Sequence, residues 1–356
     1  MTLLSGDPPR GRALQILIVL IVLGLALAPF LFPGAKALNV AAKTCVMILL
    51  VASYDLLIGY TGIVSFAHVM FFGVGAYGAG LSLYAFGASW AALALGLIVA
   101  FAVSLALALA IGLFSLRVQA IFFAMVTLAV AYAFNVLASQ LSWLTGGEDG
   151  RSFKVPAALQ PGFKWLDHPI LGVPANGKLL AYYLVFVVVV AAFLALLRVV
   201  NSPFGRVLQA IRENPFRAEA LGYRIVFHRT LATSISALGA TLAGALSALW
   251  LRYVGPDTAL SFSIQVDVLV MVVVGGMGSL YGAIIGAALF VLAESYLRDV
   301  IGSLAGAAAE ARLPLLPALF HPDRWLLWLG LAFVLAVYFA PSGVVGALRP
   351  VDGKAK

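Results

Sequence analysis

The sequence predicts an all-α polytopic membrane protein with about ten transmembrane helices (8–10). Only 10% of the 356 residues are charged, 63% are hydrophobic, and the mean hydropathy is +1.07. Soluble domains carry about 25% charged residues, so this chain could not cover its surface with polar groups in water. Its apolar runs have the length of membrane helices and lack the alternation of barrel strands. We therefore expect residues 1–356 to form a single transmembrane domain.

Ten apolar runs supply the expected helices. The third is rich in glycine and the eighth is short, so either could be re-entrant. The first follows two arginines and continues past Pro29, which favours an uncleaved span over a signal peptide. In chain order, the runs are 14–33, 40–58, 66–86, 90–115, 119–141, 179–200, 230–251, 263–276, 279–297 and 325–340.

Several kinds of chemistry are not expected. The net charge of +8 is explained by basic residues that flank apolar runs, so we predict no nucleic-acid partner. The single cysteine, Cys45, allows no internal disulfide and is expected to fill the core. The GxGxxG stretch at 73–78 has no strand before it, and the GxxxxGK stretch at 172–178 is followed by Leu179 rather than a hydroxyl residue. We predict no catalytic residue, metal site or nucleotide site.

The segment 202–229 carries five arginines between two apolar runs. Ser202-Pro203 and Asn214-Pro215 each combine an N-cap residue with proline at the first helical position. The second proline should end the first helix near Glu213. A second short helix should then end before Gly222. An apolar stripe on the first helix could rest on the membrane, on the protein's own spans or in a groove of another protein; it comprises Phe204, Val207, Leu208 and Ile211.

The orientation follows from the number of spans. Six precede 202–229, so that segment and the N-terminus should share one side of the membrane. Four more return the C-terminus, with Arg349, Lys354 and Lys356, to the same side. The density of arginine in 202–229 predicts that this side is cytoplasmic and that 142–178 is an external loop. That loop could be a connector or a docking surface for an external partner.

Two glycines, two hydroxyl residues and a histidine interrupt the apolar region after 58. They are Gly59, Gly62, Thr61, Ser65 and His68. Irregular backbone at membrane depth is tolerated only inside protein or beside a water-filled cavity. The stretch therefore indicates either a passage for a polar solute or a tight turn at the membrane surface.

A second interruption lies near 275. Gly275 and Gly276 permit a turn or a helix break. Gly278, Gly282 and Gly286 have GxxxG spacing, which would let another helix approach closely. Packing alone could explain all five glycines.

Three acidic residues lie in or near the expected spans. A charge within a span usually faces the bundle interior because of its cost in lipid. We take Asp267 as the best internal candidate and Asp55 and Glu294 as weaker ones.

The order and spacing of several motifs carry a resemblance that covers nearly the whole chain. They are Gly59-x-x-Gly62-x-x-Ser65-x-x-His68, Phe71-Phe72-Gly73-x-Gly75-Ala76-Tyr77, the stretches 122–129, 144–150 and 205–222, and Asp267…Gly275-Gly276-Met277-Gly278-Ser279-x-x-Gly282. With these motifs the chain resembles the LivM-type permeases of branched-chain amino acid ABC importers.

The resemblance implies a permease subunit in the bacterial cytoplasmic (inner) membrane. It implies a second related permease subunit, two cytoplasmic ABC ATPase subunits that bind ATP and Mg, and an extracytoplasmic substrate-binding protein. This chain would bind no cofactor. Segment 202–229 would be the cytoplasmic coupling segment, with coupling helices at about 203–222. The residues implied in ATPase coupling are Arg206, Arg212, Glu213, Ala218, Glu219, Ala220 and Gly222.

Two points stay open at the level of sequence. The first is the set of residues that contact the ATPase, because Leu221 follows Ala220 where the family's coupling motif has a fuller Glu-Ala-Ala form. The second is the substrate, because relatives in the family carry other amino acids, amides, urea or aromatic acids. The alternative function is a self-sufficient secondary transporter or channel that uses the interruptions near Gly59 and Gly275. The small number of charges inside the spans counts against ion coupling.

Overall fold

The computed structural model describes residues 11–32, 34–114, 120–165, 173–310, 321 and 324–348. Within these ranges, ten helical segments are long and apolar enough to cross a membrane, and the chain is an all-α polytopic membrane protein. The long helices are α1 (Arg12–Leu31), α2 (Ala35–Ile58), α3 (His68–Phe86), α4 (Trp90–Phe114), α5 (Ala120–Gln140), α7 (Gly177–Val200), α10 (Ile225–Leu251), α12 (Phe262–Gly275), α13 (Leu280–Glu310) and α15 (Trp325–Phe339).

Short elements connect and extend these helices. The four-residue α11 precedes α12, and together they make one candidate span, Pro256–Gly275. The two-residue strands β1 (Arg151–Ser152) and β2 (Tyr253–Val254) pair antiparallel. The others are α6 (Ser142–Thr145), η1 (Gly147–Asp149), η2 (Ala157–Leu159), α8 (Pro203–Glu213), α9 (Pro215–Ala220), α11 (Pro256–Ala259) and α16 (Gly343–Ala347).

Helix α2 is the centre of the bundle. It is buried almost continuously from Val40 to Leu57 and packs against α7, α10, α12 and α13. Its apolar residues surround the helix axis instead of forming one stripe, as expected of a helix that is covered on all sides. Cys45 is buried in this core, as predicted.

Glycines bring α3 close to its neighbours. A Cβ on Gly75 would collide with the Thr241 carbonyl of α10, and one on Gly78 would lie 3.0 Å from the Gly96 carbonyl of α4. The absence of these side chains allows backbones to approach closely, as in other membrane helices. Close packing of helices thus accounts for Gly75 and Gly78 of the GxGxxG stretch at 73–78.

Helix α3 begins inside the bundle. The His68 ring lies 3.2 Å from the Leu50 carbonyl, and Leu50 is eight residues before the end of α2. Eight residues correspond to about 12 Å of helix. The non-helical chain from Gly59 to Ala67 therefore returns into the bundle, and most of its residues are buried. Irregular backbone at this depth is thus enclosed by protein.

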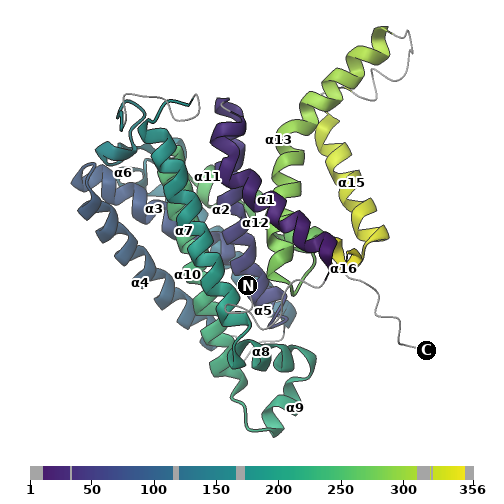
Figure 1. Cartoon of the computed structure of the whole chain (residues 1–356). Coiled ribbons are helices and arrows are strands. Elements are labelled where there is room, and N and C mark those ends of the chain that lie inside the picture. The colour runs from purple at the N-terminus through teal and green to yellow at the C-terminus, as the bar shows by residue number, and fades with distance from the viewer. Residues whose placement is uncertain are drawn as a thin grey trace.

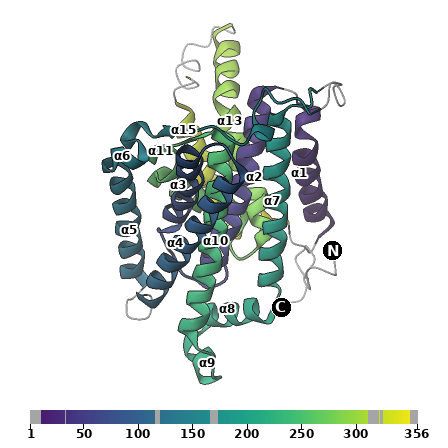
Figure 2. The ribbon, with the colours of Figure 1, turned by 90° about the vertical axis from the view of Figure 1, so that its left-hand side faces the viewer.

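The two ends of the bundle differ. Helices α8 and α9 form a hook at one end, whereas α6 lies at the other (Figures 1 and 2). Among the described residues, six long helices precede α8, as the span count predicted. Helix α13 has 31 residues and continues 13 residues beyond the predicted end at 297. The added sequence is rich in alanine, a strong helix former, although its polar residues end the apolar run.

Some predictions fall outside the described residues. These include the basic residues of the C-terminus, Arg349, Lys354 and Lys356, and also Arg10 and Gly172.

Candidate functional site

Helices α8 and α9 begin and end where the sequence predicts. Proline occupies the first position of each, and α8 ends at Glu213. The Asn214 side chain accepts a hydrogen bond from the Arg217 amide at 3.0 Å, which caps α9. Ser202 is the N-cap residue of α8, as predicted, but its side chain makes no capping hydrogen bond. Its hydroxyl turns back and donates to the Val199 carbonyl at 2.6 Å, in the last turn of α7.

Gly222 ends α9, also as predicted. Its φ is +90°, in the left-handed region that glycine adopts without penalty. The Gly222 amide donates to the Glu219 carbonyl at 2.8 Å, and the Tyr223 amide donates to the Ala218 carbonyl at 3.2 Å. This pair of bonds is a Schellman motif, which fixes the direction of the chain as it leaves the helix.

The apolar stripe of α8 rests on the protein's own spans. Leu208 and Ile211 are fully buried, and α8 packs against α7 and α10. The outer surface of the hook carries Phe216, which is 82% exposed, and Leu221, which is 71% exposed. The hook is therefore fixed to the bundle by one face and presents apolar side chains on the other.

Both glycine-rich interruptions meet at Arg212. Its guanidinium donates a hydrogen bond to the Gly59 carbonyl at the end of α2. A Cβ on Gly62 would lie 3.2 Å from the Arg212 side chain, and one on Gly278 would lie 3.1 Å from its Nη1 atom. An Asp55 carboxylate oxygen accepts a hydrogen bond from the Gly278 amide at 2.8 Å. One arginine of the hook thus contacts the breaks after α2 and before α13.

Gly278 lies in this turn and not on the face of α13, contrary to the predicted GxxxG role. Its φ is +82° and that of Gly276 is +113°, so both need glycine for their backbone conformation. The close approach of α12 and α13 depends instead on Gly282 and Gly286, where an added Cβ would meet the carbonyls of Gly276 and Met271.

The remaining residues of the second break face another short helix. A Cβ on Gly276 would lie 3.0 Å from the Ser342 carbonyl, and Gly343 of α16 is in close contact with Gly276. A Cβ on Gly275 would collide with the Gly282 carbonyl. These glycines therefore fit the α12–α13 turn against α16.

His68 and Ser65 lie deeper in the bundle than Arg212. The Nε2 atom of His68 is 3.0 Å from the Ser53 hydroxyl, and Ser236 of α10 donates to the Ser53 carbonyl at 2.6 Å. The Ser65 hydroxyl is buried and accepts a hydrogen bond from the Ala67 amide at 3.3 Å. These contacts attach the first turn of α3 to α2 and α10.

The start of α3 also donates a hydrogen bond to α12. The Gln265 side-chain oxygen accepts a hydrogen bond from the Val69 amide at 3.1 Å, although the two residues are 196 positions apart. Gln265 is almost fully buried. It was not among the predicted site residues, and its position as a polar residue within the apolar run 263–276 was the available signal.

The residues of the hook that were predicted to couple to the ATPase include a buried one and several exposed ones. Ala218 is buried and fixes α9 to the bundle. The predicted contact residues Arg206, Glu213, Glu219 and Ala220 are exposed. They are available to a partner, and Arg206 makes none of the contacts that Arg212 makes with the interruptions.

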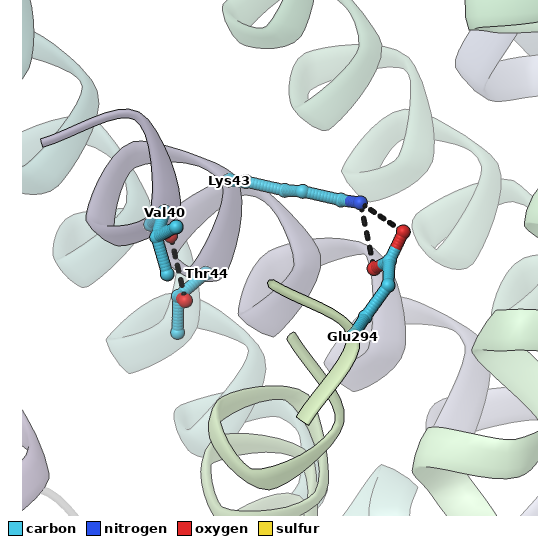
Figure 3. Close-up of polar contacts among 4 residues, drawn as sticks. All are labelled: Val40, Lys43, Thr44 and Glu294. Carbon is cyan, nitrogen blue, oxygen red and sulfur yellow. Dashed lines mark hydrogen bonds and ion pairs between the residues drawn. The ribbon is translucent and has the colours of Figure 1, made fainter. Parts of the chain in front are cut away.

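Asp267 lies apart from this junction. It is half-buried on α12, within electrostatic range of Glu294 on α13 and Lys43 on α2. Lys43 and Glu294 form an ion pair at 2.7 Å (Figure 3). Lys43 was missed by the sequence reasoning, although a lysine within an apolar run is itself a signal of a polar environment.

A cavity of about 640 Å³ lies between α3, α4 and α5. It is lined by apolar side chains such as Val74, Leu95 and Leu137 and contains none of the charged residues above. It offers almost no partner for a polar solute. Among the described residues, no group of three or more His, Cys, Asp or Glu side chains could hold a metal ion.

Comparisons with known proteins assign the chain to a protein family. Residues 36–340 match the family model described as "Branched-chain amino acid transport system / permease component". The chain is similar to a protein of Salmonella typhimurium described as "High-affinity branched-chain amino acid transport system permease protein LivM". The two are 26% identical over 352 residues, which cover 94% of this chain and 76% of that protein.

Two further relatives agree. The Escherichia coli protein with the same description is 26% identical over 350 residues, covering 94% of this chain and 75% of that protein. A Methanocaldococcus jannaschii protein, described as "Probable branched-chain amino acid transport permease protein LivM", is 28% identical over 190 residues, about half of each chain. No solved structure matches the chain.

Proposed function

The chain belongs to the permease component family of branched-chain amino acid transport systems, and from this membership we propose that it is the membrane permease subunit of an ATP-driven importer. Separate subunits bind and hydrolyse ATP, and the solute crosses the membrane chemically unchanged. Branched-chain amino acids are the proposed solutes, because the relatives' descriptions name them.

The assembly that we propose has several parts. A second related permease subunit completes the passage, two ATPase subunits bind the cytoplasmic face, and a soluble binding protein delivers the solute from outside. The hook of α8 and α9, together with both termini, faces the cytoplasm. Residues 142–178 face outward, in the cytoplasmic (inner) membrane of a bacterium.

One observation carries the ATP-driven part of the proposal: the hook joins an exposed apolar surface to both helix breaks. Phe216 and Leu221 are positioned to bind a partner, because large exposed apolar side chains gathered on one element are typical of interaction sites. Leu208 and Ile211 anchor α8 in the bundle. Arg212 then connects α8 to Gly59, so a displacement of the hook would move the breaks with it.

The breaks explain how such a displacement would change access. Segments of few residues that absorb backbone rotation act as hinges between rigid helices. Gly62 and Gly278 have left-handed φ values of +71° and +82°, and both lie beside Arg212. ATP would shift the equilibrium between two arrangements only through its different affinity for them, since it binds the partner subunits.

The test is reconstitution of the purified complex into vesicles. We expect leucine uptake that requires ATP and the binding protein and stops when the ATPase subunits carry a disabled phosphate-binding lysine. Uptake by this chain with only its permease partner, driven by an ion gradient, would instead establish a secondary transporter. A complex that assembles without any ATPase subunit and still transports would contradict the proposal.

A further inference from the structure

Three charged side chains gather from three spans, well away from the hook. Lys43 extends from α2 toward Glu294 on α13 (Figure 3). Its Nζ atom donates to both carboxylate oxygens of Glu294, at 2.8 and 2.7 Å. Asp267 on α12 is within electrostatic range of both groups.

The arrangement leaves one negative charge uncompensated. Lys43 and Glu294 neutralise each other through their two short contacts, so Asp267 adds a net charge of −1. No described residue donates a hydrogen bond to its carboxylate. Thr44, one residue after Lys43, donates its hydroxyl hydrogen bond to the Val40 carbonyl of its own helix at 2.8 Å and not to the Asp267 carboxylate (Figure 3).

Lipid is an unsuitable environment for this cluster. The side chains of Lys43 and Glu294 are 40% and 27% exposed. Charged groups within spans face the bundle interior or a water-filled cavity, because hydrocarbon does not solvate them. We therefore expect the exposed part of the cluster to border water or polar groups in the assembled protein.

The charges lie at two levels along the spans. Asp267 is eight residues before Gly275, about 12 Å along α12. Lys43 is sixteen residues before Gly59, and Glu294 is sixteen residues after Gly278, about 24 Å in each case. Gly59, Gly275 and Gly278 all belong to the helix breaks, so Asp267 lies nearer to the breaks along the spans than the ion pair does.

We propose that Asp267, together with the Lys43–Glu294 pair within its electrostatic range, forms a transient subsite for the charged end of a zwitterionic amino acid. The ammonium group of the solute donates to the Asp267 carboxylate, and its carboxylate lies toward Lys43. The net charge of −1 favours the cationic end. Along the spans, the subsite lies on the side of the helix breaks that faces away from the hook. This inference rests on the proposed function and specifies where that function meets the solute.

The test measures protection of a nearby cysteine in the intact complex without ATP. Ser263 is exposed and one turn before Asp267, so both lie on the same face of α12. A Ser263→Cys variant on a Cys45→Ser background is labelled with a water-soluble thiol reagent. We expect leucine and 3-methylbutylamine to slow labelling at least fivefold and 4-methylpentanoate, which lacks the ammonium group, to have no effect.

Substitutions of Asp267 test whether its carboxylate is responsible for the protection. Asp267→Asn should abolish protection, and Asp267→Glu, which keeps the charge, should retain it. Leu292→Cys, at an exposed apolar position on α13, provides a control that leucine should not protect. Protection that persists in Asp267→Asn, or that is absent in the parent variant, overturns the subsite. Equal protection by sodium chloride at the same concentration overturns the assignment to an organic ammonium group.

Transport supplies the second readout. Asp267→Asn should lower ATP-driven leucine uptake at least tenfold. Asp299→Asn, which removes the exposed partner of Lys36 in the outer ion pair between the same two helices, should stay within twofold. Unchanged uptake in Asp267→Asn overturns the subsite alone. Absence of ATP-driven uptake in the unmodified complex overturns the proposed function, whereas the labelling test still decides whether the subsite binds.

Discussion

Arg212 on α8 donates a hydrogen bond to the backbone carbonyl of Gly59, which lies 153 residues earlier in the sequence. The bond connects a helix outside the bundle to the end of its most buried helix, α2. Gly278 lies beside both the Arg212 guanidinium and the Gly59 carbonyl. Its amide donates a hydrogen bond to the Asp55 carboxylate. The hook and the two interruptions therefore form one connected structure.

Arg212→Ala should separate ATPase binding from transport. A hydrogen bond from a charged donor contributes about 1.5–3 kcal/mol, and 1.4 kcal/mol corresponds to a factor of ten. We expect leucine uptake to fall about tenfold or more while the ATPase subunits still co-purify. Gln209→Ala, on the outer face of the same helix, is the control and should keep uptake near the unmodified level. Normal uptake in Arg212→Ala would rule out this connection.

Gly278→Ala should destabilise the turn before α13. The left-handed backbone costs an L-residue about 1–2 kcal/mol, and the new methyl group would crowd Arg212 and Gly59. The melting temperature of the purified chain should fall. Gly24→Ala, in a helix with no atom within 4 Å of the added methyl group, should leave it unchanged or raise it slightly. Equal melting temperatures for both variants would contradict this account of the turn.

His68 and Ser53 should show coupled effects on stability. Their side chains are 3.0 Å apart and buried, and they attach the first turn of α3 to α2. We expect His68→Leu and Ser53→Ala to destabilise the chain singly, with an interaction free energy of about 0.5–3 kcal/mol in the double-mutant cycle. Unfolding in mixed micelles provides the measurement. Strictly additive effects would mean that the hydrogen bond contributes nothing.

Phe216→Ser should weaken binding of the ATPase subunits without weakening the fold. The side chain is 82% exposed, so its removal opens no cavity in the chain itself. We expect the variant to keep its melting temperature and to lose most of the co-purifying ATPase. Trp143→Ser alters a similarly exposed aromatic residue at the opposite end and should retain the ATPase. Retention by both variants would place the ATPase contact elsewhere.

Labelling from each side of the membrane should establish the orientation. On a Cys45→Ser background, Phe216→Cys should react with an impermeant thiol reagent only in inside-out vesicles. Trp143→Cys should react only in right-side-out vesicles. The opposite result would place the hook outside the cell and remove the basis for ATPase coupling.

Local signals predicted the elements of the hook well. Proline after Asn214 and glycine at 222 determine where α9 begins and ends, because caps involve only neighbouring residues. Ser202 likewise occupies the predicted N-cap position of α8, although its hydroxyl is turned toward the Val199 carbonyl and makes no capping hydrogen bond.

The contacts between distant segments could not be predicted in this way. No periodicity indicates that Arg212 meets Gly59 or that Lys43 pairs with Glu294, since each partner lies more than 150 residues away. The sequence did indicate that Asp267 is the best candidate for a charged residue that faces the bundle interior. The arrangement of α2, α12 and α13 then decides which charges surround it.

The length of α13 has a consequence for the face opposite the hook. Its 31 residues extend about 46 Å, compared with about 30 Å for the hydrocarbon layer. Unless the helix tilts strongly, several of its turns rise above the lipid on that side. A soluble protein that binds this face would therefore contact the projecting end of α13 first, away from the centre of the bundle.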